Sequence, residues 1–267
     1  MNLQTLKIYA KVWLRLTALQ FQQQVANARA AAAFLIFGKV FRFVTAFIFL
    51  FVIVSQAKVL AGYNLAQAVF VLALFNWGSS LTQLFFRGVY QFKQKVEDGT
   101  FDFYLLSPIS ELFYSLFSYT DPLDAMLMVP YTVVLGWAWI NTGYPVTAVS
   151  IIVLMLSLVA MALFVFSVHV FILSIGVKYL EVDNTIMLYR DLERMAAYPI
   201  DIYGKYISPF LTYIIPFAVL ATIPAKIIFG QINPMMLLIF VSLSLCETYL
   251  ALRFWRYSLK DYTSASS

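Results

Sequence analysis

Residues Ser150 to Ser174 read SIIVLMLSLVAMALFVFSVHVFILS, an unbroken apolar stretch without Asp, Glu, Lys or Arg. At about 1.5 Å of rise per residue, a helix of this length would cross the roughly 30 Å hydrocarbon core of a bilayer. The stretch contains the single histidine of the chain, His169. A lone histidine in such a helix more often satisfies a local hydrogen bond than acts as a ligand or base. The stretch therefore predicts a transmembrane helix.

The rest of the chain has the same character. Of its 267 residues, 62% are hydrophobic and 12% are charged, whereas soluble domains carry about 25% charged residues. We therefore expect an all-α polytopic membrane protein, with a single domain over residues 1–267 and six transmembrane helices. The predicted spans cover residues 34–54, 65–86, 123–140, 150–174, 210–228 and 235–252. Pro216 and Pro224 lie in the fifth span, where neighbouring helices can satisfy the freed carbonyls.

The distribution of Lys and Arg predicts the orientation. With the N-terminus inside, fourteen of these residues fall in inside segments and two, Lys58 and Lys226, fall in outside loops. The positive-inside rule then predicts that both termini lie in the cytoplasm. We expect the protein in the cytoplasmic (inner) membrane. The net charge of +5 is thus an orientation signal that also favours contact with anionic membrane lipid, and it does not indicate nucleic-acid binding.

Two segments outside the predicted spans have amphipathic patterns. Residues 4–30 predict a helix that lies on the membrane surface, with basic residues on one face and Trp13 among the apolar residues on the other. This helix is either a plain anchor or an elbow that also touches a cytoplasmic partner. A second short helix is predicted within the inside segment 176–209, ending before Pro199. It would rest on the lipid surface or against the helix described next. Its charged residues are Arg190, Asp191, Glu193 and Arg194.

The longest polar break between apolar stretches, residues 98–108, reads DGTFDFYLLSP. Asp98 and Thr100 are good N-cap residues, and Pro108 disfavours helix at Ser107. One short helix therefore fits within residues 97–108. It is too short to span a bilayer and too apolar to remain in water, so we expect it to dock in a partner's groove or at the lipid surface.

Three charged residues fall within predicted spans. Lys39 and Arg42 lie in the first span and Glu247 lies in the sixth, at similar depths from the cytoplasmic side. An unpaired charge at such depth costs about 2–3 kcal/mol, less if the side chain snorkels. We therefore predict that Glu247 pairs with Arg42 or Lys39, within one chain or between two. The alternative is that each charge reaches the headgroup region alone.

Catalytic motifs are missing from the sequence. It has no His-Glu-x-x-His zinc pattern, no Gly-x-Ser-x-Gly elbow and no phosphate-binding loop. Cys246 is the only cysteine, so no disulfide forms within the chain. We therefore expect no enzyme activity, and no cofactor or metal in this chain. Two alternatives stay open: a lipid-modifying enzyme that uses Asp121, Asp124 and Glu247, and a scaffold subunit of a membrane complex.

The run KVEDGTFDFYLLSPI, residues 95–109, resembles the signature of ABC-2-type ABC transporter permeases. The pairs Tyr-Pro at 198–199, Pro-Phe at 216–217 and Pro-Ala at 224–225 extend the resemblance over nearly the whole chain, although Ser107 replaces a usual Arg. The resemblance implies the membrane subunit of an ABC exporter that works by alternating access. It also implies a second permease chain, identical or related, and a separate ABC ATPase subunit that binds ATP and Mg²⁺.

The same resemblance implies that residues 97–108 form a coupling helix seated in a groove of the ATPase. The coupling residues that it assigns are Glu97, Asp98, Gly99, Phe101, Asp102, Leu105, Leu106 and Pro108. Among these, Phe101, Asp102, Leu105 and Leu106 are expected to make the contacts. The transported substrate is not indicated by the sequence.

Overall fold

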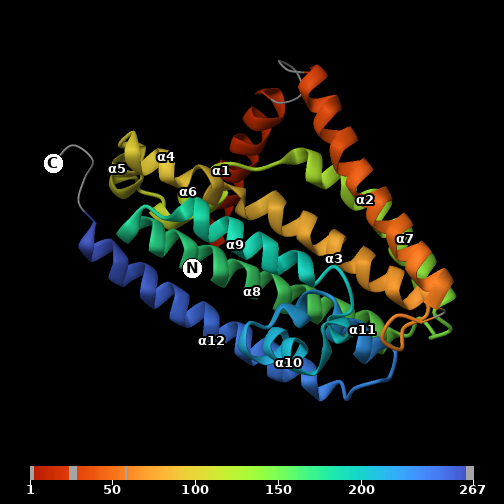
Figure 1. Ribbon diagram of the computed structural model, residues 1–267. Coiled ribbons are helices and arrows are strands. Elements are labelled where there is room, and N and C mark those ends of the chain that lie inside the picture. Colours follow the sequence, from red (N-terminus) through yellow and green to blue (C-terminus); the bar gives the residue numbers. More distant parts are fainter. Residues whose placement is uncertain (1–2, 24–28, 58, 263–267) are drawn as a thin grey trace.

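The computed structural model describes residues 3–23, 29–57 and 59–262, and in these residues the fold is all-α (Figure 1). An isolated pair of backbone hydrogen bonds between Leu60 and Tyr63 is the only bridge among them. The α-helices are α1 (Leu3–Phe21), α2 (Arg29–Ala57), α3 (Leu65–Phe86), α4 (Phe92–Glu97), α5 (Thr100–Leu106), α6 (Glu111–Phe117), α7 (Pro122–Asn141), α8 (Ala148–Tyr179), α9 (Val182–Met195), α10 (Gly204–Pro209), α11 (Thr222–Ile228) and α12 (Met235–Ser258).

Five helices of the described chain are long and apolar enough to cross a membrane: α2, α3 with its extension through α4, α7, α8 and α12. They confirm five of the six predicted spans and make the chain a polytopic membrane protein. Helices α4, α5 and α6 gather at one end of the bundle, together with the end of α12 (Figure 1). We call this the α5 end. The opposite end carries α10 and α11, and we call it the α11 end.

Local sequence explains where the spanning helices begin. Asn64 caps α3 and Thr147 caps α8, each in a reciprocal capping box with the residue three positions later. Asp121 caps α7 by accepting a hydrogen bond from the Leu123 amide, and Pro122 follows at the first helical position. These caps satisfy amide groups that would otherwise be unpaired at the helix start.

The core of the bundle is formed by α3, α7, α8 and α12. Helix α8 packs along α12, and α3 packs along α7. Helix α2 is different, because it contacts the bundle mainly through its second half, where Leu50 is fully buried. Its first half diverges from the bundle (Figure 1) and exposes aromatic side chains such as Phe34 and Phe37. Gly88, in the 3-10 helix η2 (Arg87–Gln91), lets α6 approach closely, since a Cβ there would lie 2.4 Å from the Ser115 carbonyl oxygen.

The predicted fifth span, residues 210–228, is not a continuous helix. It contains a π-helical turn, η4 (Phe210–Ile214), a 3-10 helix, η5 (Phe217–Leu220), and α11. The break falls at Ile215, which is extended because it precedes Pro216. The prediction of a continuous fifth span, with Pro216 accommodated by neighbouring helices, is therefore wrong. These short elements lie at the α11 end (Figure 1).

Helix α9 takes the chain from the α5 end toward the α11 end. The predicted short helix in segment 176–209 is confirmed as a helix, but it lies along α8 instead of outside the bundle (Figure 1). Near its start, Asp183 pairs with Lys93 of α4 at 3.5 Å, and further along Tyr189 contacts the ring of Phe217 in η5. Its buried residues are Val182, Ile186, Tyr189 and Glu193, a single helical face.

The N-terminal helix is shorter than predicted. Helix α1 ends at Phe21, and residues 29 and 30 belong to α2, while residues 24–28 of the predicted 4–30 helix lie outside the described part of the chain. Tyr9, Trp13 and Thr17 share one face of α1 and contact Phe113, Phe85 and Thr120, respectively. This face fastens α1 to the segment around α6. Its location at a membrane surface stays a prediction.

Candidate functional site

Helix α5 is held in a fixed conformation by its own flanking residues. Gly99 precedes it with φ of +76°, a backbone conformation that favours glycine. The Asp98 carboxylate accepts a hydrogen bond from the Thr100 amide at 2.9 Å. Hydrogen bonding to the Thr100 side chain, and then to this amide, holds the pKa of Asp98 below its usual value. Ser107 is extended ahead of Pro108 and ends the helix. The predicted short helix within residues 97–108 is therefore present, with bounds of Thr100–Leu106.

One face of α5 is buried against the C-terminal part of the chain. Phe101 is fully buried, and its ring lies 5.0 Å from Phe92, 6.2 Å from Trp255 and 5.1 Å from Tyr262, measured between centroids. The Tyr262 hydroxyl donates a hydrogen bond to Asp102 at 2.8 Å. These contacts join α5 to α4 and to the end of α12. The expectation that Phe101 contacts another subunit is therefore wrong for this conformation.

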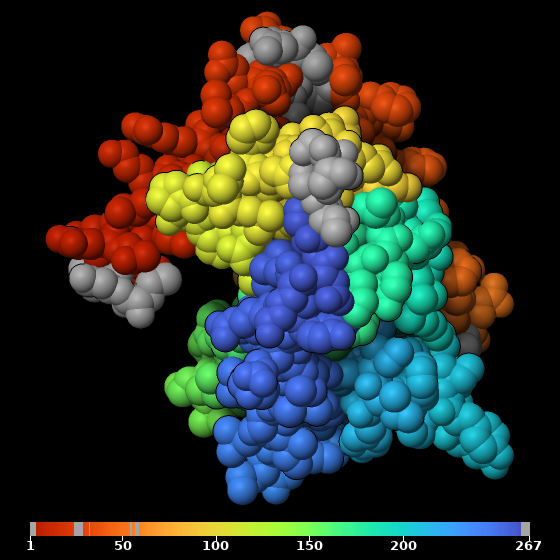
Figure 2. Space-filling model, turned by 90° about the vertical axis from the view of Figure 1, so that its left-hand side faces the viewer, coloured from red at the N-terminus to blue at the C-terminus, as the bar shows by residue number. Residues whose placement is uncertain are grey.

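The other face of α5 is open to the surroundings. Leu106 is 82% exposed, Phe103 is 72% exposed and Leu105 is 40% exposed. Phe103 thus occupies the outward position that was predicted for Phe101. Glu97, Asp98 and Pro108 are exposed beside them. Figure 2 looks onto the α5 end and shows the α4–α6 region, in yellow, as a protruding surface beside α12. Exposed apolar side chains on such a protrusion are typical of a docking surface.

Four charged side chains form a network between α2, η2 and the start of α7. Lys39 donates hydrogen bonds to Asp121 at 2.8 Å and to Asp124 at 2.7 Å. Arg87 also pairs with Asp121 and reaches Asp124 at 3.2 Å. Both carboxylates are buried, so the two cations neutralise charges that would be costly alone. The network fastens α2, which makes few contacts with the other helices, to the start of α7.

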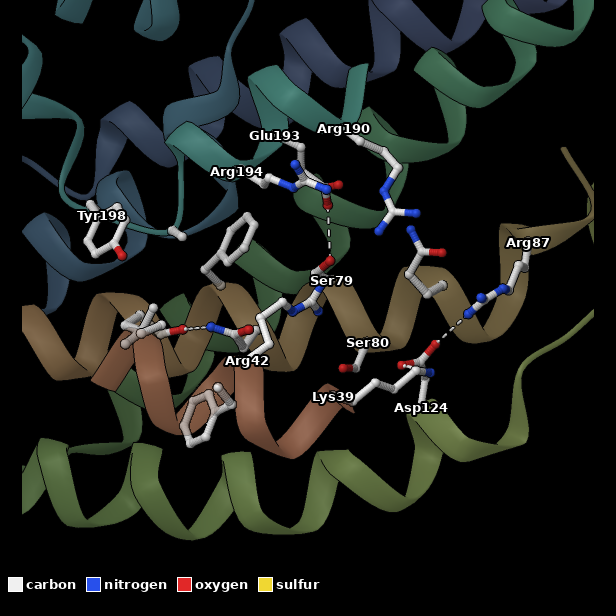
Figure 3. A pocket seen from close by; sticks show the side chains of 17 residues that line it. Lys39, Arg42, Ser79, Ser80, Arg87, Asp124, Arg190, Glu193, Arg194 and Tyr198 are labelled. Carbon is white, nitrogen blue, oxygen red and sulfur yellow. Dashed lines mark hydrogen bonds and ion pairs between the residues drawn. The ribbon is translucent and has the colours of Figure 1, made fainter. Parts of the chain in front are cut away.

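A cavity of about 360 Å³ with both charged and apolar side chains in its lining lies between α2, α3 and α9 (Figure 3). The network just described forms one end of its lining, through Lys39, Arg87 and Asp124. Arg42 enters from α2, and α9 contributes a further set of charged residues. Glu193 of α9 is buried and accepts a hydrogen bond from the Ser79 hydroxyl of α3 at 3.1 Å. The α9 residues in the lining are Arg190, Glu193 and Arg194.

The predicted pairing of Glu247 is not found within one chain. Lys39 is engaged by Asp121 and Asp124, and Arg42 forms no ion pair with any described residue. Glu247 lies on α12, across the bundle from α2, and forms no hydrogen bond with the described residues. A pairing between two chains stays a prediction. The three carboxylates proposed for an enzyme therefore do not converge, because Asp121 and Asp124 are separated from Glu247 by the bundle.

Two groups of residues at these sites are not predicted by the sequence. The first is the set on α9, a helix whose amphipathic pattern predicts a location on the lipid surface or against the helix within residues 97–108. The spacing of Tyr189 and Glu193 was a usable signal, since a carboxylate in line with apolar residues is often buried with a partner. The second is Tyr262, near the end of the described chain, which no local pattern links to α5.

Comparison with known proteins adds one finding. A family model described as ABC-2 family transporter protein matches residues 40–266. This range includes the charged cavity lining from Arg42 onward, α5, α9 and α12, and leaves out α1 and the first part of α2. No curated protein and no solved structure matched the chain.

Proposed function

The chain belongs to the ABC-2 transporter family and is a membrane permease of an ABC transporter, and we propose that it exports its substrate when a separate ABC ATPase docks on α5. The observation that carries the proposal is the two-sided character of α5. Phe101 anchors the helix inside the chain, while Phe103 and Leu106 project away from it. A rigid helix with an exposed apolar face suits the transmission of a movement from another subunit.

The distribution of charge supports a cytoplasmic α5 end. The described Lys and Arg residues at the α11 end are Lys205 and Lys226, in α10 and α11. Those on α1 and at the α5 end are Lys7, Lys11, Arg15, Arg87, Lys93, Lys95, Lys178, Arg253, Arg256 and Lys260. The asymmetry remains although Arg190 and Arg194 of α9 are no longer counted among the inside residues. It agrees with the positive-inside rule. An ATPase, with its ATP and Mg²⁺, would then meet α5 from the cytoplasm.

Helix α9 supports a sixth crossing of the membrane. With α9 as the first part of that crossing, both ends of the chain lie on the same side, as the orientation requires. The elements from α10 to α11 would then form a short re-entrant segment on the outer side. Such irregular backbone is tolerated at membrane depth where protein surrounds it, and Phe217, Val219 and Ala221 are indeed buried.

A second permease chain is proposed to cover α2. The apolar side chains of this helix are exposed along most of its length, among them Phe37, Phe41 and Ile48. Lipid would cover part of this surface. A partner chain would cover the rest, and would enclose a pathway that one small bundle does not enclose alone.

The experiment is co-purification of the full-length chain from native membranes in mild detergent, followed by native mass spectrometry. The expected species contains two permease chains and two ATPase subunits. A stable species with one permease chain would contradict the dimer, and the absence of any ATPase under conditions that preserve the permease would contradict the exporter.

A further inference from the structure

The cavity between α2, α3 and α9 has more positive than negative charge. Its lining includes five cations, Lys39, Arg42, Arg87, Arg190 and Arg194, and two carboxylates, Asp124 and Glu193. Figure 3 shows the side chains of Arg42 and Arg190 approaching the cavity from two different helices, α2 and α9. Two further carboxylates, Asp121 and Asp191, lie outside the lining and pair with cations of the cavity.

Most of the cations are neutralised by the chain itself. Lys39 and Arg87 are matched by Asp121 and Asp124. Arg194 pairs with Asp191 at 3.0 Å on the same helix.

Arg42 and Arg190 remain, and they face one carboxylate. The charges of both act on Glu193, which is already hydrogen-bonded to Ser79. Arg190 also lies over the Tyr90 ring, 5.5 Å from its centroid, and Arg42 forms no ion pair with a described residue. One positive charge is therefore left without a matching acid.

This surplus lies alongside the middle of the bundle. Ser79 and Glu193 mark the level of the cavity, and Ser79 lies well inside the second predicted span. A guanidinium group at membrane depth is costly unless it has a counter-charge or reaches water. Arginine in particular presents several donors in a planar fork that matches phosphate and carboxylate groups. The natural complement of this cavity is an anion.

We propose that the cavity binds the anionic headgroup of an amphiphilic substrate, a phosphate or carboxylate carried on an apolar tail, with Arg42 and Arg190 as its contacts. This inference rests on the proposed function and names the class of cargo. The apolar part of the ligand is inferred from the apolar side chains of the cavity lining, Leu72 and Phe75 of α3 and Phe43 of α2. A soluble anion would make no apolar contact with that surface, whereas the tail of an amphiphile would pack against it.

The test measures binding without ATP or ATPase. The full-length chain is placed in nanodiscs of zwitterionic phosphatidylcholine, and dodecyl phosphate is titrated by calorimetry, with empty nanodiscs subtracted. Dodecyltrimethylammonium is the matched cationic probe, and inorganic phosphate tests whether the tail contributes. The variants are Arg42→Gln and Arg190→Gln. Arg253→Gln is the control, because Arg253 is an exposed arginine on α12 that is absent from the cavity lining.

Dodecyl phosphate should bind saturably and the cationic probe should not. Each cavity variant should weaken binding about tenfold or more, since charge-assisted hydrogen bonds are strong, and the control should bind like the parent chain. Arg42→Lys keeps the positive charge and loses the planar guanidinium, so its affinity for dodecyl phosphate should lie between those of the parent chain and Arg42→Gln. Equal binding of both detergents, or unchanged affinity in both cavity variants, would overturn the inference. If inorganic phosphate binds as tightly as dodecyl phosphate, the proposal that the ligand carries an apolar tail is wrong.

The two proposals can fail separately. Anion binding that persists in a chain that associates with no ATPase would contradict the exporter and leave the cavity assignment standing. An exporter complex whose permease shows no preference for the anionic probe would contradict the cavity assignment and leave the exporter standing.

Discussion

The Tyr262 hydroxyl donates a hydrogen bond to Asp102 at 2.8 Å, and this contact ties the end of the described chain to the proposed coupling helix. Burial, and then the hydrogen bond to Asp102, raise the pKa of Tyr262 to about 12. The hydroxyl is therefore protonated and able to donate at neutral pH. Together with Trp255 and Phe101, this contact makes α5 and α12 one structural unit. A displacement of α5 would therefore be transmitted to the spanning helix α12.

The two phenylalanines of α5 should respond in opposite ways to truncation. Phe101→Ala should destabilise the protein by about 3–5 kcal/mol, because it removes a fully buried ring. Phe103→Ala should change stability little, because that ring is 72% exposed. Thermal unfolding of both variants in the same detergent measures the difference. Equal losses would contradict the burial of Phe101 described above.

Charge on the outward face of α5 should uncouple the ATPase. Leu105→Asp with Leu106→Asp, or Leu106→Asp alone, should abolish permease-stimulated ATP hydrolysis in proteoliposomes, because a carboxylate would be forced into an apolar groove. Leu180→Asp is the matched control, since Leu180 is an exposed leucine between α8 and α9 with φ of +57°. Aspartate tolerates that backbone conformation. Full stimulation in the Leu106 variant would rule out docking through this face.

Substitutions in the charged network at the start of α7 should have non-additive effects on stability. Lys39→Met and Asp124→Asn each leave a buried charge short of a partner. Each should lower the unfolding temperature. In a double-mutant cycle, the double variant should lose less free energy of unfolding than the two single variants together, by about 1 kcal/mol or more. Hydrogen exchange should rise in α2 in the Lys39 variant. Strictly additive effects would mean that this ion pair does not fasten α2.

A second tether should stabilise the α11 end. Asp201 accepts hydrogen bonds from Lys226 of α11 at 2.6 Å and from Tyr63 at 2.9 Å. Asp201→Ala removes both, so hydrogen exchange should rise in α11 and in residues 60–64 while α5 is unaffected. Asp183→Ala is the control, because the Asp183–Lys93 pair is exposed at the α5 end and surface pairs contribute about 0–1 kcal/mol. Unchanged protection in α11 would contradict the tether.

Several features of this protein were predictable from short stretches of sequence. The five long spans follow from apolar length alone, since bilayer thickness sets the number of residues that a crossing needs. The bounds of α5 follow from Gly99, Asp98 and Pro108, which act on their immediate neighbours. The family follows from the residues around α5, and the family match agrees with it. All of these depend on interactions within a few residues.

The expected contacts that are not found within one chain concern which segments meet. Whether Phe101 faces a partner or the core depends on Trp255 and Tyr262, which arrive from the other end of the chain. Whether Glu247 pairs with Arg42 or Lys39 of the same chain depends on α2 and α12 being neighbours, and the bundle places these helices on opposite sides. A pairing between two chains stays a prediction. The pairing with Asp121 and Asp124 instead follows from contact between α2 and the start of α7.

The sequence by itself determined that the chain is a membrane-embedded helical bundle with a short, capped and partly apolar helix between two spans. Hydrophobic length and backbone capping are local properties, so no knowledge of neighbours was needed. Only the tertiary structure decided that α9 packs along α8 with one face buried. A helix as polar as α9 is stable there because Ser79, Tyr90 and the cavity receive its polar side chains, and those partners are brought together by packing alone.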